Sequence, residues 1–208
     1  MDGSLIAVTP NYSWPVPVNT DYVKDGAEAI KDLGDAIDST VFGLPAGGLT
    51  LISATTFTAQ TGVSIDDCFS ATYSNYKVVV AYTNTTSGTQ TNIRFRTSGV
   101  DNTTSNYRYM CQRIGTNGSG YNLLGSANLA AVNTGTADTC TLSFDAISPN
   151  KSEETNLAGN SVGQSSTGFF TAGVIGVNFV ATTVFDGITI YFAAGTGTGT
   201  IKIYGYQD

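Results

Sequence analysis

The feature that most constrains this fold is a change of hydrophobic periodicity at the paired glycines Gly47 and Gly48. Before them, apolar residues recur at helical spacing, and after them apolar and polar residues alternate to the end of the chain. Alternation with a period of two is typical of strands that bury one face. The segment 76–83 shows it most clearly, with Tyr76 and Val78 on one face and Lys77 on the other. The sequence therefore predicts a helical region followed by an all-β domain at 44–208.

Strand patterns recur through the second region and are separated by turn signals rich in Gly, Ser, Thr and Asn. They lie at 49–57, 76–83, 93–96, 107–114, 121–132, 140–146, 157–162, 169–177, 188–192 and 201–206. None is followed by a helix of crossover length, which excludes a parallel α/β sheet, and the lack of a fixed repeat argues against a propeller. The expected fold class is mainly β: an antiparallel β-sandwich or jelly roll with an N-terminal extended arm and one amphipathic helix.

The helix is expected at 21–43, between the N-cap residues that precede it and the Gly and Pro residues that follow it. Val23, Ile30 and Ile37 recur every seven residues, with Leu33 beside them, on an otherwise acidic helix. A seven-residue apolar repeat is the seam of a coiled coil. We therefore assign oligomerisation to these four residues.

Two glycines interrupt the helix pattern, Gly26 and Gly34. Each costs roughly 1 kcal/mol of helix stability relative to alanine, so contacts outside the helix must compensate. Two explanations fit the sequence. Either neighbouring helices approach closely at the glycines, or the helix bends where the N-terminal arm docks.

The first twenty residues are predicted to form an extended arm, because proline restricts itself and the residue before it to extended geometry. A pre-extended arm loses little entropy when it docks, and it carries exposed aromatic side chains. The residues assigned to docking are Tyr12, Trp14, Pro15 and Pro17. The alternative is a disordered terminus.

The amino-acid composition argues against several classes of function. The chain has no histidine, so it lacks the commonest metal ligand and the usual general base, and three widely spaced cysteines form neither a zinc pattern nor a disulfide framework. A net charge of −7 argues against nucleic-acid binding, and the apolar run at 169–185 is too short and too rich in strand-forming residues to span a membrane. No cleavable signal is expected at the start of the chain. We expect no catalytic residue, no metal and no cofactor, and buried free thiols.

All four arginines lie within twenty residues, and they are expected on neighbouring strands. They either contact an acidic glycan or acidic neighbour, or pair with the acidic loops of the same chain, and the second reading is favoured. Tyrosines nearby are expected to be exposed, where they would suit sugar stacking or a subunit interface. The candidate receptor or neighbour contacts are Arg94, Arg96, Arg108, Tyr107 and Tyr109.

Three stretches resemble parts of bacteriophage virion proteins. Residues 11–38, which begin Asn-Tyr-Ser-Trp-Pro-Val-Pro-Val, resemble the N-terminal segment of many phage tail-fibre and minor tail proteins. Residues 199–206, Gly-Thr-Ile-Lys-Ile-Tyr-Gly-Tyr, are similar to the closing strand of phage fibre head domains, and residues 68–80 look like the early strands of the same domain.

The resemblance implies a structural virion protein, assembled in the host cytoplasm. Its residues 1–20 would attach to other virion proteins of the capsid or tail, a short coiled coil at 21–43 would join three identical chains, and a jelly-roll head would face outward. The implied function is host-surface attachment, with a host cell-surface glycan as a partner and the loops at 85–88, 102–106 and 115–120 as further contacts. The leading alternative is a head fibre or capsid decoration protein that stabilises the shell, and a polysaccharide depolymerase is a third hypothesis. The heptad spacing alone permits two strands as well as three.

Overall fold

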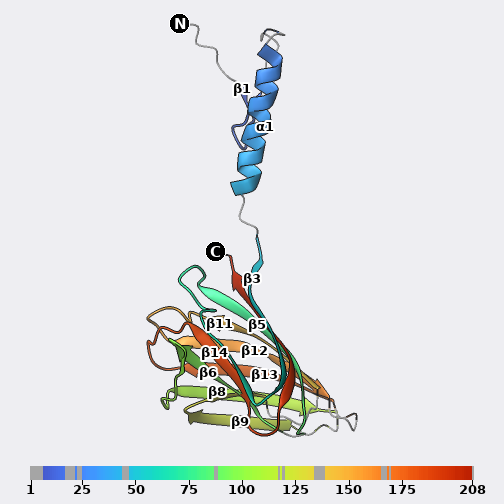
Figure 1. Ribbon diagram of the computed structural model, residues 1–208, viewed down its shortest axis with the longest axis vertical. Coiled ribbons are helices and arrows are strands. Elements are labelled where there is room, and N and C mark those ends of the chain that lie inside the picture. The colour runs from blue at the N-terminus through green and yellow to red at the C-terminus, as the bar shows by residue number, and fades with distance from the viewer. Residues whose placement is uncertain are drawn as a thin grey trace. The chain divides into compact units, whose positions relative to one another are not determined.

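The computed structural model describes residues 7–16, 22, 25–43, 47–86, 89–116, 118, 120–133, 139–164, 168 and 170–207. The chain divides into two compact units, Met1–Gly47 and Gly48–Asp208 (Figure 1). The first contains the helix of the described chain and the second is built of antiparallel strands. The mainly β fold class with one helix is confirmed.

The first unit is a small hairpin packed on helix α1 (Gly26–Gly43). Strands β1 (Ala7–Val8) and β2 (Pro15–Val16) pair antiparallel, and the Trp14 indole N–H donates to Thr40 Oγ1 at 2.8 Å. The predicted extended arm is therefore wrong for residues 7–16. The chain turns back because Ser13 takes a left-handed conformation (φ 54°) and its N–H donates to the Thr9 carbonyl at 3.0 Å.

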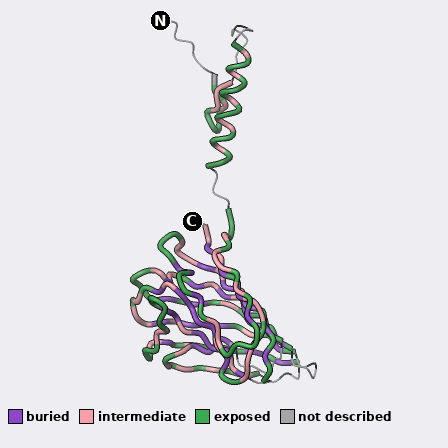
Figure 2. The backbone as a smooth tube through the Cα atoms, viewed as in Figure 1, coloured by how far each residue is buried: buried purple, intermediate pink, exposed green. Residues whose placement is uncertain are grey.

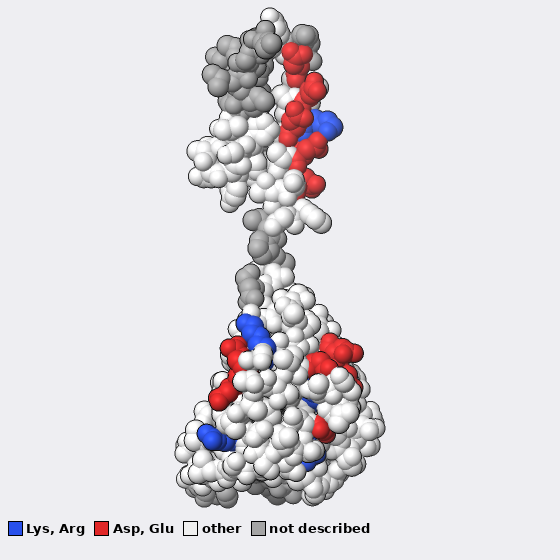
Figure 3. All heavy atoms as spheres, turned by 90° about the vertical axis from the view of Figure 1, so that its left-hand side faces the viewer, with Lys and Arg blue, Asp and Glu red and all other residues white. Residues whose placement is uncertain are grey.

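Helix α1 ends at Gly43, as the sequence predicts, but it begins at Gly26 rather than at 21. Asp25 lies in a single 3₁₀ turn before it. No residue of α1 is buried, and Figure 2 shows no purple on it. Acidic side chains gather along one side of the helix (Figure 3), as its amphipathic pattern predicts.

The second unit is a sandwich of two antiparallel sheets. The eight-stranded sheet has the order β3 (Leu49–Gln60), β15 (Gly197–Tyr206), β5 (Asn75–Asn84), β11 (Thr139–Ile147), β12 (Thr155–Gln164), β13 (Phe170–Phe179), β8 (Tyr107–Gly115) and β9 (Gly120–Ala127). The other sheet has the order β10 (Ala130–Asn133), β6 (Thr91–Thr97), β14 (Gly187–Phe192) and β4 (Gly62–Ile65), with β7 (Val100–Asp101) paired to β6. The antiparallel sandwich is as expected, whereas the jelly-roll connectivity stays a prediction.

One continuous core fills the space between the sheets, visible as purple segments in Figure 2. Alternate residues of each strand point into it, such as Tyr76, Val78 and Val80 of β5, all fully buried. Aromatic rings pack edge-to-face at one end, where Phe179 lies 4.9 Å from Phe185 between ring centroids. Such burial supplies the main free energy that holds the two sheets together.

Two strand predictions differ from the structure. The segment 121–132 was expected as one strand, but it breaks at residues 128–129, so that β9 joins the eight-stranded sheet and β10 the other. The short strands β4 and β7 were not predicted, because strands of four and two residues carry too few alternating positions to show a period.

Candidate functional site

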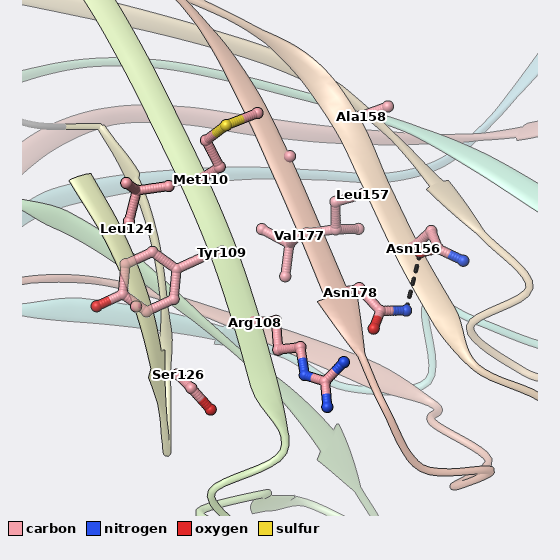
Figure 4. Close-up of a pocket in the computed structure, with 12 residues that line it drawn as sticks. Arg108, Tyr109, Met110, Leu124, Ser126, Asn156, Leu157, Ala158, Val177 and Asn178 are labelled. Carbon is pink, nitrogen blue, oxygen red and sulfur yellow. Dashed lines mark hydrogen bonds between the residues drawn. The ribbon is translucent and has the colours of Figure 1, made fainter. Parts of the chain in front are cut away.

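A groove of about 690 Å³ lies on the outer face of the eight-stranded sheet, over strands β12, β13, β8 and β9 (Figure 4). The register of these strands builds it from two rows of side chains that face away from the core. The polar row is Asn156, Asn178, Arg108 and Ser126. The apolar row is Ala158, Gly176, Met110 and Leu124.

The apolar row forms the floor and one wall of the groove. Met110 is 50% exposed and Leu124 is 68% exposed, although each lies at a position where a water-facing strand residue is normally polar. Gly176 keeps the floor low. A Cβ added there would meet only the Met110 carbonyl oxygen, at 3.8 Å, so packing within the chain does not require glycine.

The polar row is organised by hydrogen bonds between neighbouring strands. The Asn178 amide donates to Asn156 Oδ1 and to Glu154 Oε2, each at 3.0 Å, and Figure 4 shows the first of these. Glu154 lies two residues before Asn156, and Ala158 lies two residues after it. Glu154 is exposed, directly precedes β12, and is tied to the polar row by its hydrogen bond from Asn178.

Arg108 is the one charged residue that lines the groove. It is exposed, and in the described part of the chain no carboxylate lies within 4.0 Å of it, the salt-bridge distance. Figure 4 shows its guanidinium beside Asn178, its register partner on β13. The groove thus combines an apolar floor with a polar edge that contains one cation.

The four arginines do not form the single cluster that the sequence predicts. Arg94 and Arg96 lie on β6, whereas Arg108 and Arg113 lie on β8 of the other sheet. The prediction was wrong because the chain crosses from one sheet to the other between β6 and β8. Arg113 is buried, on the inner face.

Arg96 is a structural residue rather than a contact for an external molecule, since only 9% of it is exposed. Its guanidinium donates to Asp66 Oδ1 at 2.6 Å, to the Asp101 carboxylate, and to hydroxyls of β4 and β14. Burial lowers the pKa of Arg96, but the hydrogen bonds and charges of Asp66 and Asp101 outweigh it and raise the pKa above its usual value. The favoured reading, pairing within the chain, holds here.

Arg94 has partners of the same kind. It lies 3.9 Å from the Asp101 carboxylate, donates to the Asn128 carbonyl at 3.0 Å, and stacks over Tyr191 with 5.0 Å to the ring centroid. Its charge is therefore engaged within the domain. Of the three arginines proposed as external contacts, Arg108 is the one that lies in the groove.

Tyr107 is fully buried, so its prediction as an exposed contact is wrong. Its hydroxyl accepts from the Phe95 N–H at 2.9 Å and donates to the Asn102 carbonyl at 3.1 Å, and burial raises its pKa. Tyr109 is half-buried against the core. Gly125 on β9 makes room for it, because a Cβ there would lie 2.3 Å from Tyr109 Oη.

The residues assigned to virion docking lie mostly against the chain's own helix. Trp14 and Pro15 are half-buried there, and Tyr12 stacks on Trp14 with ring centroids 5.1 Å apart. Tyr12 keeps 59% of its surface exposed. Pro17 lies outside the described residues.

The predicted helix seam is only partly covered. Leu33 and Ile37 are half-buried, whereas Ile30 is 66% exposed, and Val23 lies outside the described residues. The helical residues with intermediate burial turn toward one side: Gly26, Ala29, Leu33, Ala36, Ile37 and Thr40. Ile30, Gly34 and Val41 lie next to this side and are exposed.

No protein-family model matches the chain, and no curated protein sequence is detectably similar to it. Within the described ranges, no three His, Cys, Asp or Glu side chains are grouped so as to hold a metal ion. No helix of the described chain is long and apolar enough to cross a membrane. Cys68, Cys111 and Cys140 are buried and none of them is in a disulfide, as the sequence predicts.

Sequence reasoning missed most of the groove. Met110, Leu124 and Gly176 carry no chemistry of their own, and Asn156 and Asn178 are two of many asparagines. One signal was available: in 107–114, the outward positions of an alternating strand hold Met110 and Ile114 among polar residues. Several exposed apolar residues on the solvent-facing side of a strand indicate a contact surface.

Proposed function

We propose that this chain is a non-enzymatic structural protein of a bacteriophage virion, assembled through its helical unit and displaying its β-sandwich for attachment to the host surface. The observation that carries the proposal is the helix: none of its residues is buried, and its apolar face is only partly covered. The phage setting rests on the resemblance of residues 11–38 and 199–206 to virion fibre proteins.

The helical unit needs partners for physical reasons. Most of the stability of a helix in a protein comes from packing of its amphipathic face, and glycine at position 34 weakens this helix by about 1 kcal/mol. The hairpin covers one side, yet Ile30 and Val41 stay more than half exposed. Identical helices packed along this face would bury both side chains. A homotrimer is the number that the resemblance supports.

The β-sandwich suits a display role. Its groove lies on four hydrogen-bonded strands at one end of the eight-stranded sheet, so the binding surface loses little conformational entropy when it is occupied. Polar groups along one edge give orientation, and the apolar floor supplies burial. Loops at 102–106 and at the ends of the strands offer further contacts.

Electron microscopy of purified phage particles, with the protein marked by antibody-bound gold, tests the proposal. We expect label on the particle, at the tips or shafts of fibres. A protein absent from purified particles would refute the virion assignment.

A capsid decoration protein is a second candidate, and the breadth of the exposed apolar surface favours it. Beyond the groove, the same sheet face exposes Ile114, Val162, Phe170 and Val174, each more than 35% accessible. Together with Met110 and Leu124 they present on the order of 500 Å² of largely apolar surface, as large as known interaction patches. Gold label over the whole shell, at a copy number that follows the capsid lattice, would favour decoration over attachment.

A further inference from the structure

We propose that the groove on β12, β13, β8 and β9 binds an acidic oligosaccharide, with a sugar carboxylate held by Arg108 and the ring faces lying on Ala158 and Gly176. This inference rests on the proposed attachment function and names the class of its ligand. It uses the two rows of side chains, their charge and their spacing.

The arrangement of the rows points to a ligand that is amphipathic along its whole length. Polar side chains run beside the apolar floor on all four strands, from Asn156 to Ser126. An alkyl chain would need polar groups only at one end of a groove. A pyranose has C–H groups on its face and hydroxyls around its rim, so it places the face on the floor and the hydroxyls on the amides.

The dimensions fit a short oligosaccharide. Adjacent strands lie about 4.8 Å apart, so four strands span roughly 14 Å, the length of two to three sugar units. Rows two residues apart along a strand are separated by about 7 Å, close to the width of one ring. The small side chains of Ala158 and Gly176 leave the depth that a ring needs.

The charge in the groove selects an acid. Arg108 is the one charged residue among those that line it, and its planar guanidinium matches a carboxylate with two parallel hydrogen bonds. The net charge of −7 does not cancel this local preference, because charges beyond about 8 Å are screened at physiological ionic strength. The opposing charge at the polar row is Glu154, whose carboxylate accepts from the Asn178 amide and lies more than 4.0 Å from the Arg108 guanidinium.

Calorimetric titration of the purified full chain tests the proposal. The probes are tetramers of galacturonic acid, a sialylated tetrasaccharide and a glucuronate-containing tetrasaccharide, each with its neutral methyl ester, and hexaglutamate as an acidic chain without sugar rings. We expect at least one acidic tetrasaccharide to bind at least tenfold tighter than its own methyl ester, and hexaglutamate to bind no tighter than the esters.

Matched variants localise the binding. Arg108→Gln should weaken the acidic tetrasaccharide at least tenfold, whereas Lys202→Gln, which removes the same charge from the exposed face of β15 in the same sheet, should change it less than twofold. Gly176→Val fills the floor and should also abolish binding. Glu154→Gln removes the opposing charge and should tighten binding about twofold. Unchanged thermal unfolding of each variant shows that the fold is retained.

Three results would overturn the proposal: no acidic tetrasaccharide binding at millimolar concentration, equal binding of acid and ester, or equal losses in Arg108→Gln and Lys202→Gln. These results are independent of the particle labelling. If the protein is found on particles but binds no glycan, the virion assignment stands and the ligand proposal fails. If it binds acidic glycans but is absent from particles, the ligand proposal stands and the virion assignment fails.

Discussion

Arg96 links neighbouring strands of the five-stranded sheet through its guanidinium. It joins β6 to Asp66 after β4, to Asp101 of β7 and to Thr189 of β14. Arg96→Met would leave Asp66 without its cation and Asp101 with Arg94 alone, at 3.9 Å. Because both carboxylates are partly exposed, we expect a loss of about 1 to 3 kcal/mol in free energy of unfolding, less than for a fully buried pair. Urea titration measures it. Arg108→Met, an exposed arginine without such partners, should cost less than about 0.5 kcal/mol, and equal losses would contradict the distinction.

The buried thiols make the fold sensitive to alkali. Burial raises the pKa of Cys68 from 9.0 to about 12 and that of Cys140 to about 11. Because the folded chain holds these protons more tightly than the unfolded chain, their stabilisation is complete below pH 9.0 and is lost as the pH rises through 11 to 12. One pH unit above the unfolded pKa, each thiol costs about 1.4 kcal/mol.

Urea unfolding at about pH 8 and pH 10 tests this effect. Wild type should lose roughly 2 to 3 kcal/mol over that interval, by the linkage between proton binding and stability. The double variant Cys68→Ala, Cys140→Ala should be less stable at pH 8 and should show a smaller loss. An unchanged pH dependence in the double variant would show that other groups cause it.

The positions of the arginines and tyrosines in the fold could be predicted only in part from the sequence. The four arginines were visible, but which sheet each joins depends on where the chain crosses the sandwich, and no local pattern marks that crossing. Tyr107 and Tyr109 occupy inward positions of β8, and their predicted exposure failed because tyrosine suits both a surface and a core with a partner for its hydroxyl. Gly176 and Ala158 matter through the space they leave, which composition does not reveal.

Helix α1 contains a glycine, Gly34, that no contact within the chain requires. A Cβ on Gly34 would meet nothing within 4 Å, so the chain itself gives no reason for a residue that costs about 1 kcal/mol. Close approach of a second helix gives one, because a methyl group there would hold the backbones apart. This favours the first of the two explanations, close approach, over a bend.

Gly34→Ala separates helix stability from assembly. We expect it to raise the helix content of the dissociated chain, through a gain of about 1 kcal/mol, and to weaken association at least tenfold. Circular dichroism and sedimentation equilibrium measure the two effects. Ser39 lies on the acidic side of α1, so the control variant Ser39→Ala should stabilise the helix without changing association. If Gly34→Ala strengthens association, the helices do not meet at this position.

The elements themselves were largely predictable, since long strands with strict alternation, such as β5 and β11, and the end of α1 match the sequence patterns. The hairpin at residues 7–16 was not, because a tight turn at Ser13 and two-residue strands leave almost no periodic signal. The prolines favour an extended backbone and so predict an arm, but an extended backbone at Pro15 is equally compatible with an edge strand that packs on a neighbouring helix.

At the scale of the whole molecule, the two units have different physical requirements. The β-sandwich has a complete core of its own, whereas the helical unit has no buried helix residue and exposes apolar side chains. A chain with one self-sufficient domain and one incomplete unit is expected to assemble through the incomplete one. The assembled β-domains would then present several copies of the groove, and multiple weak contacts gain strength from their shared attachment.

Sedimentation equilibrium of the full chain at micromolar concentration measures whether the helical unit joins three chains. We expect a single species of three times the 21.6 kDa chain mass for wild type. Ile30→Asp, which places a charge on the uncovered helix face, should give the monomer mass while the β-sandwich keeps its thermal transition. A monomeric wild type, or an Ile30→Asp variant with the wild-type mass, would contradict the claim that the helix organises the assembly.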